Sequence, residues 1–352
     1  MANEKKTVRE PSFILALVPI VAMIGFMLYC FRGHSETGYH DAHLPLVMSI
    51  IVACIVGFIC GHSFQEMLAG MVERLAASME AVLILATVGF LVTSFMLSGA
   101  IPTMIVYGLD LLTPQLFLPV GCILCAIVGM ACGSSWTTTA TIGLAFLGIG
   151  VGLGIPAPIT AGMIISGAYV GDKFSPLSDT TNLAAAVAET GLFDHVTAMV
   201  STTGPTLLLS LILYTILGLN VDTSAYDATV AEGIQEAFRS AFTISPILLL
   251  PIIVVIVMCI LRVPGLVGIA VSVATAVVFM LIFQSTDIYY SRSLGDIFDV
   301  LHYGHAVETG NAVADSILGK AKGMDGMMWT INLILLALAY GGALERCGCV
   351  ER

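Results

Sequence analysis

The chain has 352 residues, of which 58% are hydrophobic and only 11% are charged, and its mean hydropathy is +0.99. This composition excludes an ordinary soluble domain, which carries about a quarter of charged residues. The formal net charge is -11 and the isoelectric point is near 4.9. Nucleic-acid binding is therefore excluded as well, because it requires a basic surface.

Long apolar runs with few or no charges indicate membrane spans, because about 20 helical residues cross the hydrocarbon core of a bilayer. The sequence thus predicts an all-α polytopic membrane protein with about nine to ten transmembrane helices, some of them broken or re-entrant. The predicted spans are residues 12–31, 43–61, 81–99, 115–132, 139–155, 196–218, 244–261, 264–283 and 327–344.

The N-terminal residues 1–11 are charged, precede the first apolar run and lack the cleavage site of a secretory signal. Lys5, Lys6 and Arg9 favour a cytoplasmic N-terminus by the positive-inside rule. We therefore expect an uncleaved first helix and a multi-pass protein of the cell (inner or plasma) membrane. The expected transporter domain covers residues 12–346, and residues 347–352 form the C-terminal end.

Several polar features outside the apolar runs have structural explanations. His34, His40 and His43 lie close together in sequence, and a solvated loop is favoured over a metal site or a pH sensor. Residues 64–80 predict an interfacial amphipathic helix. Most of the nine cysteines lie in or at the ends of apolar runs, where cysteine acts as a small hydrophobic residue, so no disulfide framework is expected.

The densest polar cluster lies in residues 166–184, SGAYVGDKFSPLSDTTNLA, and apolar sequence surrounds it. Residues 157–171 predict a mostly apolar half-helix of roughly 22 Å, which is short of a hydrocarbon core of about 30 Å. Pro176 lacks an amide proton and prevents a continuous helix. We therefore predict a helix that is broken near the middle of the membrane. An extramembrane turn is the alternative, and the apolar flanks disfavour it.

The oxygen atoms in this cluster are the ligands that a small hard cation prefers. Asp172 and Asp179 are the only acidic residues at the break, and with Lys173 they give a formal charge of −1. One monovalent cation or one proton neutralises this charge, and burial favours a neutralised carboxyl group. Competition between the two for one carboxylate is the simplest mechanism of a cation/proton antiporter. The predicted ion-binding and coupling residues are Asp172, Lys173, Ser175, Ser178, Asp179, Thr180, Thr181 and Asn182.

A second run of hydroxyl groups lies within residues 129–155, beside a glycine-rich apolar stretch. We predict that Ser134, Ser135, Thr137 and Thr138 form a second polar wall that faces the break. Hydrogen bonding between the small residues of neighbouring helices is the alternative. Lys173 is expected to pair with a carboxylate of the break when no cation is bound.

The GDKFSPLSDTTNLA stretch closely resembles the signature of the NhaC-type sodium/proton antiporter family, within the broader ion-transporter superfamily. Residues 133–143, GSSWTTTATIG, and 341–351, GGALERCGCVE, resemble two further segments of that family. The resemblance implies two inverted repeats, each with a re-entrant or broken helix, and a sodium site with Asp172 and Asp179 as its metal ligands. It implies exchange of Na+ for H+ with no cofactor, with the lipid bilayer and the two ions as partners.

Members of this family usually continue beyond the point at which this chain ends, so the second repeat is expected to be incomplete. Inverted-repeat transporters build their site from both halves. The sequence therefore leaves open a homodimer, a missing second-repeat chain or a non-transporting truncated remnant. Na+-coupled exchange of small organic anions, of the malate/lactate type, is a further alternative, with Lys173 holding the anion. An enzyme is not expected, since Asp172 and Asp179 lie on one segment and no HExxH motif is present.

Overall fold

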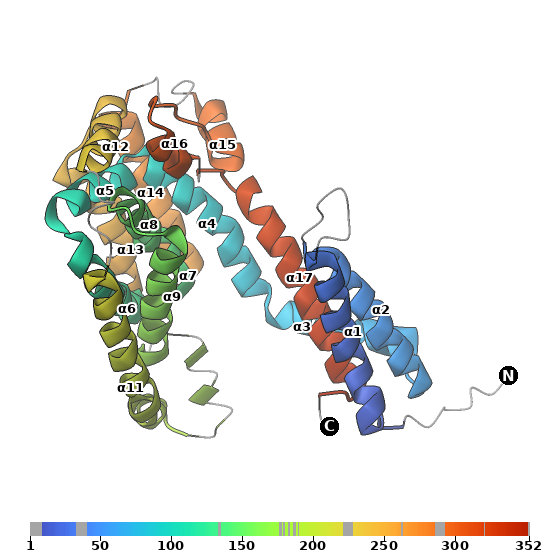
Figure 1. The fold of residues 1–352 in the computed structure, drawn as a ribbon. Helices are drawn as coiled ribbons and strands as arrows, with labels where there is room; N and C mark the ends of the chain where they lie inside the picture. The colour runs from blue at the N-terminus through green and yellow to red at the C-terminus, as the bar shows by residue number, and fades with distance from the viewer. Residues whose placement is uncertain are drawn as a thin grey trace. The chain divides into compact units, whose positions relative to one another are not determined.

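The structure is a computed structural model, and every regular element that it describes is a helix (Figure 1). The prediction of an all-α protein is confirmed for these residues. Contacts within the chain divide it into two units: residues 1–86 with 327–352 form the first, and residues 87–326 form the second. The described residues are 9–32, 41–132, 135–175, 178, 180–181, 184–185, 188, 190–220, 228–261, 263–285, 293–319 and 321–350.

The first unit is a group of apolar helices around a small core. Met67 and Ala53 are fully buried in this core, together with Ala343. Asp41 connects two of the helices, because it contacts Nδ1 of His43 and accepts a hydrogen bond of 3.0 Å from Nε1 of Trp329. The bond with His43 lowers the pKa of the Asp41 carboxyl group. His34 and His40 lie outside the described residues. The helices are α1 (Phe13–Phe31), α2 (His43–Ile59), α3 (Phe64–Ala77), the start of α4 (Met79–Leu97) and most of α17 (Asp325–Arg346).

The local sequence explains where these helices begin. The hydroxyl group of Ser12 accepts a hydrogen bond from the backbone of Leu15, which satisfies one of the first amide groups of α1. Ser63 and Glu66 form a capping box at the start of α3. The predicted amphipathic helix over residues 64–80 is therefore present, and it ends at Ala77.

The second unit contains most of the helices and the polar break. Its core includes the fully buried side chains of Phe117, Phe238 and Ile105. Its elements are the rest of α4, α5 (Ala100–Leu111), α6 (Pro114–Cys132), α7 (Ser135–Thr138), the π-helical turn η1 (Thr139–Gly143), α8 (Leu144–Gly152), α9 (Ala157–Phe174), α11 (Leu192–Leu219), α12 (Ala228–Ala241), the 3-10 turn η2 (Pro246–Leu249), α13 (Leu250–Ile260), α14 (Gly265–Phe283), α15 (Leu294–Tyr303) and α16 (Ala312–Leu318).

Every predicted span lies largely on helical structure, but few single helices are long enough to cross a membrane. Among the described residues, four helices meet this criterion by length and composition, and two bent helix pairs raise the number to six. The structure thus supports a polytopic membrane protein, and the predicted number of spans stays a prediction. The four single helices are Phe13–Phe31, Leu192–Leu219, Leu266–Phe283 and Asp325–Arg346.

The side chain of Gln284 forms hydrogen bonds with the backbone at two helix breaks of the second unit. Gln284 is only 3% exposed and follows the last residue of α14. Its Nε2 donates to the carbonyl oxygen of Ser98, between α4 and α5, at 3.0 Å. Its Oε1 accepts a hydrogen bond of 3.0 Å from the backbone amide of Thr243. Thr243 lies between two helical segments, residues 231–241 and 246–258, whose axes differ in direction by 91°. The amide group thus satisfies backbone atoms that neither break can satisfy by itself.

We predict that Gln284→Leu lowers the free energy of unfolding by about 2 kcal/mol or more, because each buried backbone group left without a partner costs about 1–3 kcal/mol. Thermal unfolding of the purified protein in detergent measures the effect. The control is Thr275→Val, which removes an exposed hydroxyl group that bonds only within α14. Equal unfolding midpoints for the two variants would contradict the role given to Gln284.

Candidate functional site

The polar break follows α9, and proline residues define both ends of this helix. Pro156 and Pro158 lie at its start, where a missing amide proton costs nothing. Ser175 is extended, with φ −81° and ψ 124°, as expected of a residue that precedes a proline. The 18 helical residues span about 27 Å, so α9 is longer than the half-helix predicted over residues 157–171 and close to the shortest helices that cross a membrane. The helix ends at Phe174, so Asp172 and Lys173 lie in its last turn.

Helix α9 lies directly against the backbone of α6 because both helices carry glycine at the contact. A Cβ atom on Gly167 would lie 2.3 Å from the carbonyl oxygen of Cys122, and one on Gly171 would lie 2.2 Å from that of Ala126. From the other side, a Cβ atom on Gly129 would lie 2.8 Å from the carbonyl oxygen of Ala168. Glycines four residues apart are typical of such close helix crossings in membranes.

This contact fixes Asp172, which is the next residue after Gly171. Asp172 is only 8% exposed, and its Oδ2 accepts a hydrogen bond of 3.2 Å from the hydroxyl group of Ser135. Ser135 is the first residue of α7 and is 4% exposed. The structure therefore brings together one residue from each of the two predicted polar segments.

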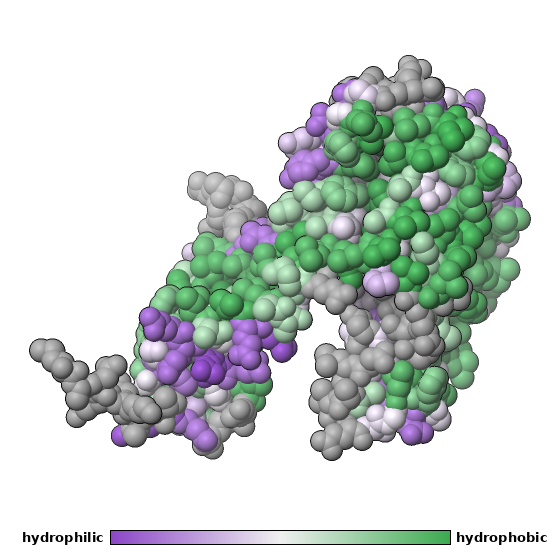
Figure 2. Space-filling view, turned by 180° about the vertical axis from the view of Figure 1, so that it is seen from behind, coloured by the Kyte–Doolittle hydropathy of each residue, from purple (hydrophilic) through white to green (hydrophobic). Residues whose placement is uncertain are grey.

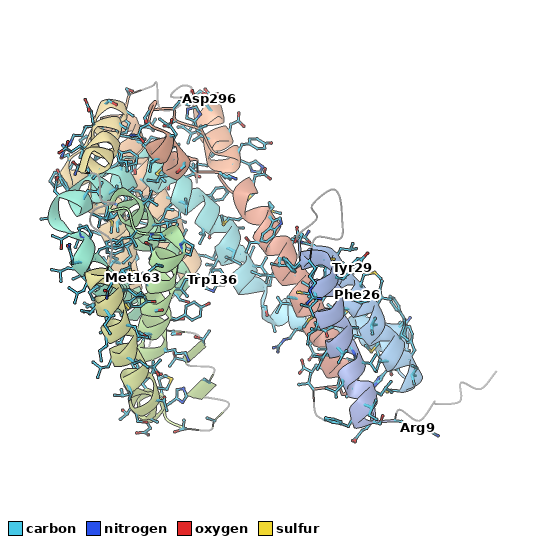
Figure 3. All side chains as sticks on the ribbon, in the orientation of Figure 1. Arg9, Phe26, Tyr29, Trp136, Met163 and Asp296 are labelled. Carbon is cyan, nitrogen blue, oxygen red and sulfur yellow. The ribbon has the colours of Figure 1, made fainter. Side chains whose placement is uncertain are left out.

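The helix that follows Ser135 is locally widened. Residues Thr139–Gly143 form a π-helical turn between α7 and α8, and such turns are frequent at functional sites. The hydroxyl group of Thr139 donates to the carbonyl oxygen of Ser135 at 2.8 Å. Thr138 is fully buried. Met163 of α9 is also fully buried, whereas Trp136, beside Ser135, is 50% exposed (Figure 3).

The polar segment after α9 folds back over the end of that helix. Thr181, which is 3% exposed, places its hydroxyl group 3.2 Å from the carbonyl oxygen of Lys173 and 3.4 Å from that of Asp172. Ser178 is fully buried, and its hydroxyl group lies 2.9 Å from that of Thr180. Ser175 is also fully buried. The Thr181 hydroxyl group thus serves the carbonyl groups of the last turn of α9, where the helical hydrogen bonds stop.

Lys173 differs from its neighbours, because its side chain is exposed. Within the described part of the chain, no carboxylate lies within 4.0 Å of its amino group. The expected pairing of Lys173 with a carboxylate of the break stays a prediction. Asp179, Asn182 and Ser134 lie outside the described residues, as does the side chain of Thr137.

Metal-ligating side chains do not gather elsewhere in the described ranges: no group of three or more His, Cys, Asp or Glu residues could hold a metal ion. The described buried polar side chains at the break all present oxygen atoms: the Asp172 carboxylate and the hydroxyl groups of Ser135, Ser175, Ser178 and Thr181. Such ligands suit a small hard cation.

Comparison with known proteins supports the resemblance found in the sequence. A sequence model described as the Na+/H+ antiporter family matches residues 167–352, more than half of the chain, including Asp172 and Lys173. The Na+/H+ antiporter NhaC of Alkalihalophilus pseudofirmus is 34% identical over 311 residues, which are 88% of this chain and 66% of that protein. The chain belongs to the Na+/H+ antiporter family.

Two other relatives are named for different substrates, and their matches also cover nearly the whole of this chain. The arginine/ornithine antiporter ArcD of Halobacterium salinarum is 36% identical over 346 residues, covering 97% of this chain and 69% of ArcD. The malate-2H+/Na+-lactate antiporter of Bacillus subtilis is 31% identical over 346 residues, covering 98% of this chain and 72% of that protein. No solved structure matches the chain.

The sequence analysis did not identify the glycines of α9 as site residues, although the four-residue spacing of Gly167 and Gly171 in an apolar helix was a usable signal.

We predict that Gly171→Ala destabilises the fold by about 1–3 kcal/mol, because the new methyl group overlaps the backbone of α6. Gly162→Ala in the same helix is the control, since the nearest atom to its new Cβ would be 3.8 Å away. Thermal unfolding should separate the two variants, and a Gly171→Ala midpoint equal to that of the control would contradict the prediction.

Proposed function

We propose that the chain exchanges Na+ for H+ across the membrane and that Asp172 is the carboxylate for which the two ions compete. The observation that carries this proposal is the burial of Asp172 beside the Ser135 hydroxyl group, in the last turn of α9. Asp172 lies in the part of the chain that the family model matches.

The exchange follows from the cost of a charge away from water. A buried carboxylate is stabilised when a proton or a cation neutralises it, and one carboxylate accommodates one such partner at a time. Asp172 therefore releases its proton when Na+ enters and takes one up when Na+ leaves. This mutual exclusion couples the two movements.

Ser135 can bond to the site both when Na+ is absent and when Na+ is bound, because a hydroxyl group carries one donor and two acceptor positions. In the structure, its Oγ donates to Asp172. When Na+ is bound, a rotation of the same hydroxyl group turns its oxygen toward the cation. We propose that Ser175, Ser178 and Thr181 supply further oxygen ligands, together with Asp179 and Asn182.

We expect Asp172→Asn to abolish Na+-dependent proton movement, because an amide side chain neither binds a proton nor neutralises a cation. Everted membrane vesicles that contain the chain, with an acridine dye to report the proton gradient, measure the activity upon addition of Na+. Asp299→Asn is the matched control, since Asp299 is an exposed carboxylate on α15. Normal exchange by Asp172→Asn would refute the assignment, and a wild-type chain with no Na+ response would refute the proposed function itself.

We expect Ser135→Ala to raise the Na+ concentration needed for half-maximal exchange about tenfold, which corresponds to about 1.4 kcal/mol and is close to the lower limit for hydrogen bonds to charged groups. The maximal rate should change less, because Asp172 remains. Thr139→Val serves as the control, since this hydroxyl group bonds to its own helix. An unchanged Na+ dependence in Ser135→Ala would show that the bond to Asp172 has no part in cation binding.

Na+-coupled exchange of a small organic ion is the second candidate. It is favoured by the substrates in the names of the arginine/ornithine and malate/lactate relatives, and by the exposed Lys173 next to the buried Asp172. Vesicles preloaded with radiolabelled malate, lactate, arginine or ornithine distinguish the two candidates. Release of any of these upon addition of Na+ favours the second.

We propose a multi-pass protein of the cell membrane with a cytoplasmic N-terminus, as the basic residues before α1 favour. It transports Na+ and H+ without a cofactor. The chain spans 66% of the length of the Alkalihalophilus pseudofirmus antiporter and 69% of that of ArcD, and inverted-repeat transporters build their site from both halves.

A further inference from the structure

A polar cavity of about 610 Å³ lies in the first unit, which does not contain Asp172. Its lining is unusual for an apolar protein, because it has equal numbers of positive and negative side chains. The charged residues of the lining, apart from a histidine, are Arg9, Arg74, Arg346, Glu10, Glu73 and Glu345.

The close crossing of α3 and α17 brings two of these arginines together. A Cβ atom on Gly342 would lie 2.5 Å from the carbonyl oxygen of Gly70, so the two backbones touch at this point. The same Cβ would lie 3.0 Å from the Cβ of Arg74, and a Cβ on Gly70 would lie 2.7 Å from that of Arg346. Arg74 and Arg346 therefore leave their helices on either side of one contact.

The third arginine comes from the segment before α1. The backbone amide of Arg9 donates to the carbonyl oxygen of Cys60 at 2.8 Å, which ties this segment to the end of α2. Arg9 lies beside the first turn of α1 (Figure 3). Three guanidinium groups from three separate segments thus line one cavity.

These guanidinium groups are available to a ligand. Over the ranges that the structure describes, none of the three arginines forms an ion pair within 4.0 Å. Among the described residues, Glu73 and Glu345 therefore share the cavity with the arginines without an ion pair to any of the three. A ligand with one anionic and one cationic group would meet both kinds of side chain, whereas a simple anion would meet a lining with no net charge.

The cavity lies at the ends of two helices that are long and apolar enough to cross a membrane. Pro11 of the lining comes two residues before the start of α1, and Arg346 is the last residue of α17. Both helices are long and apolar enough to cross a membrane, so their ends mark the membrane surface. Figure 2 shows hydrophilic residues gathered toward one end of this unit, next to an apolar surface.

We propose that this cavity binds the headgroup of a phospholipid that carries both a phosphate and a primary amine. Arginine matches phosphate oxygens with two parallel hydrogen bonds, and basic pockets at membrane helices bind lipid headgroups. Glu73 and Glu345 accept hydrogen bonds from the ammonium group. This site is independent of ion exchange at Asp172.

Binding to the purified 352-residue chain tests the proposal. Native mass spectrometry in detergent measures retention of phosphatidylethanolamine, phosphatidylglycerol and phosphatidylcholine, and inorganic phosphate is added as a competitor. We expect phosphatidylethanolamine to bind about tenfold more tightly than phosphatidylcholine, whose quaternary amine has no N–H group, since one charged hydrogen bond is worth at least about 1.4 kcal/mol.

The variants separate the two halves of the headgroup. Arg74→Gln with Arg346→Gln should weaken all the phospholipids about tenfold or more, and Arg74→Lys with Arg346→Lys should recover part of the affinity. Glu73→Gln with Glu345→Gln should abolish only the preference for the primary amine. Arg32→Gln is the control, because Arg32 is an exposed arginine outside the cavity at the C-terminal end of α1. Circular dichroism checks that each variant retains its helical content.

Three results would overturn the proposal. Unchanged lipid retention in the double arginine variant, with its helices intact, would show that the cavity is not the site. Equal or tighter binding of phosphatidylglycerol would show recognition of a net anion. Complete displacement of the lipid by millimolar inorganic phosphate would identify a site for free phosphate.

Discussion

The end of α9 and its contacts with α6 and α7 place one carboxylate away from water. An ionisable group inside a membrane costs at least about 2.5 kcal/mol on insertion scales, so its neighbours must repay that cost with specific contacts. Asp172 has Ser135 as one such partner, and its helix is held against α6 by backbone contact. The broken helix, the hydroxyl groups and the glycine spacing are parts of this one solution.

The backbone presents the same constraint as the side chain. A helix that stops short of the membrane surface leaves carbonyl groups without partners, and lipid supplies none. At the end of α9, the Thr181 hydroxyl group lies within hydrogen-bond distance of the carbonyl oxygens of the last turn. Gln284 does the same for two other breaks by contributing both halves of its amide group. Polar side chains in this apolar protein therefore complete the backbone as much as they form a site.

The sequence predicted the elements that depend on local chemistry. Apolar runs located the helices, and Pro176 located the end of α9, because the residue before a proline avoids the helical conformation. The hydroxyl-rich run was expected to face the break, and Ser135 does contact Asp172; its part in ion binding stays a prediction. The sequence could not supply the pairing of α3 with α17 or the shared role of Gln284. These depend on residues far apart in the chain, and no local pattern shows which of them meet.

The contact of Gly167 and Gly171 with α6 also limits how the transporter can move. Transport requires the site to open to each side of the membrane in turn, and such changes proceed by rigid-body rocking of helix groups. Two helices that touch through their backbones cannot slide past one another without collision, because there is no side-chain layer between them to rearrange. We therefore expect helices α6 and α9 to move as one body that carries Asp172. Alternating access by such a body would require the surrounding helices to shift around this pair.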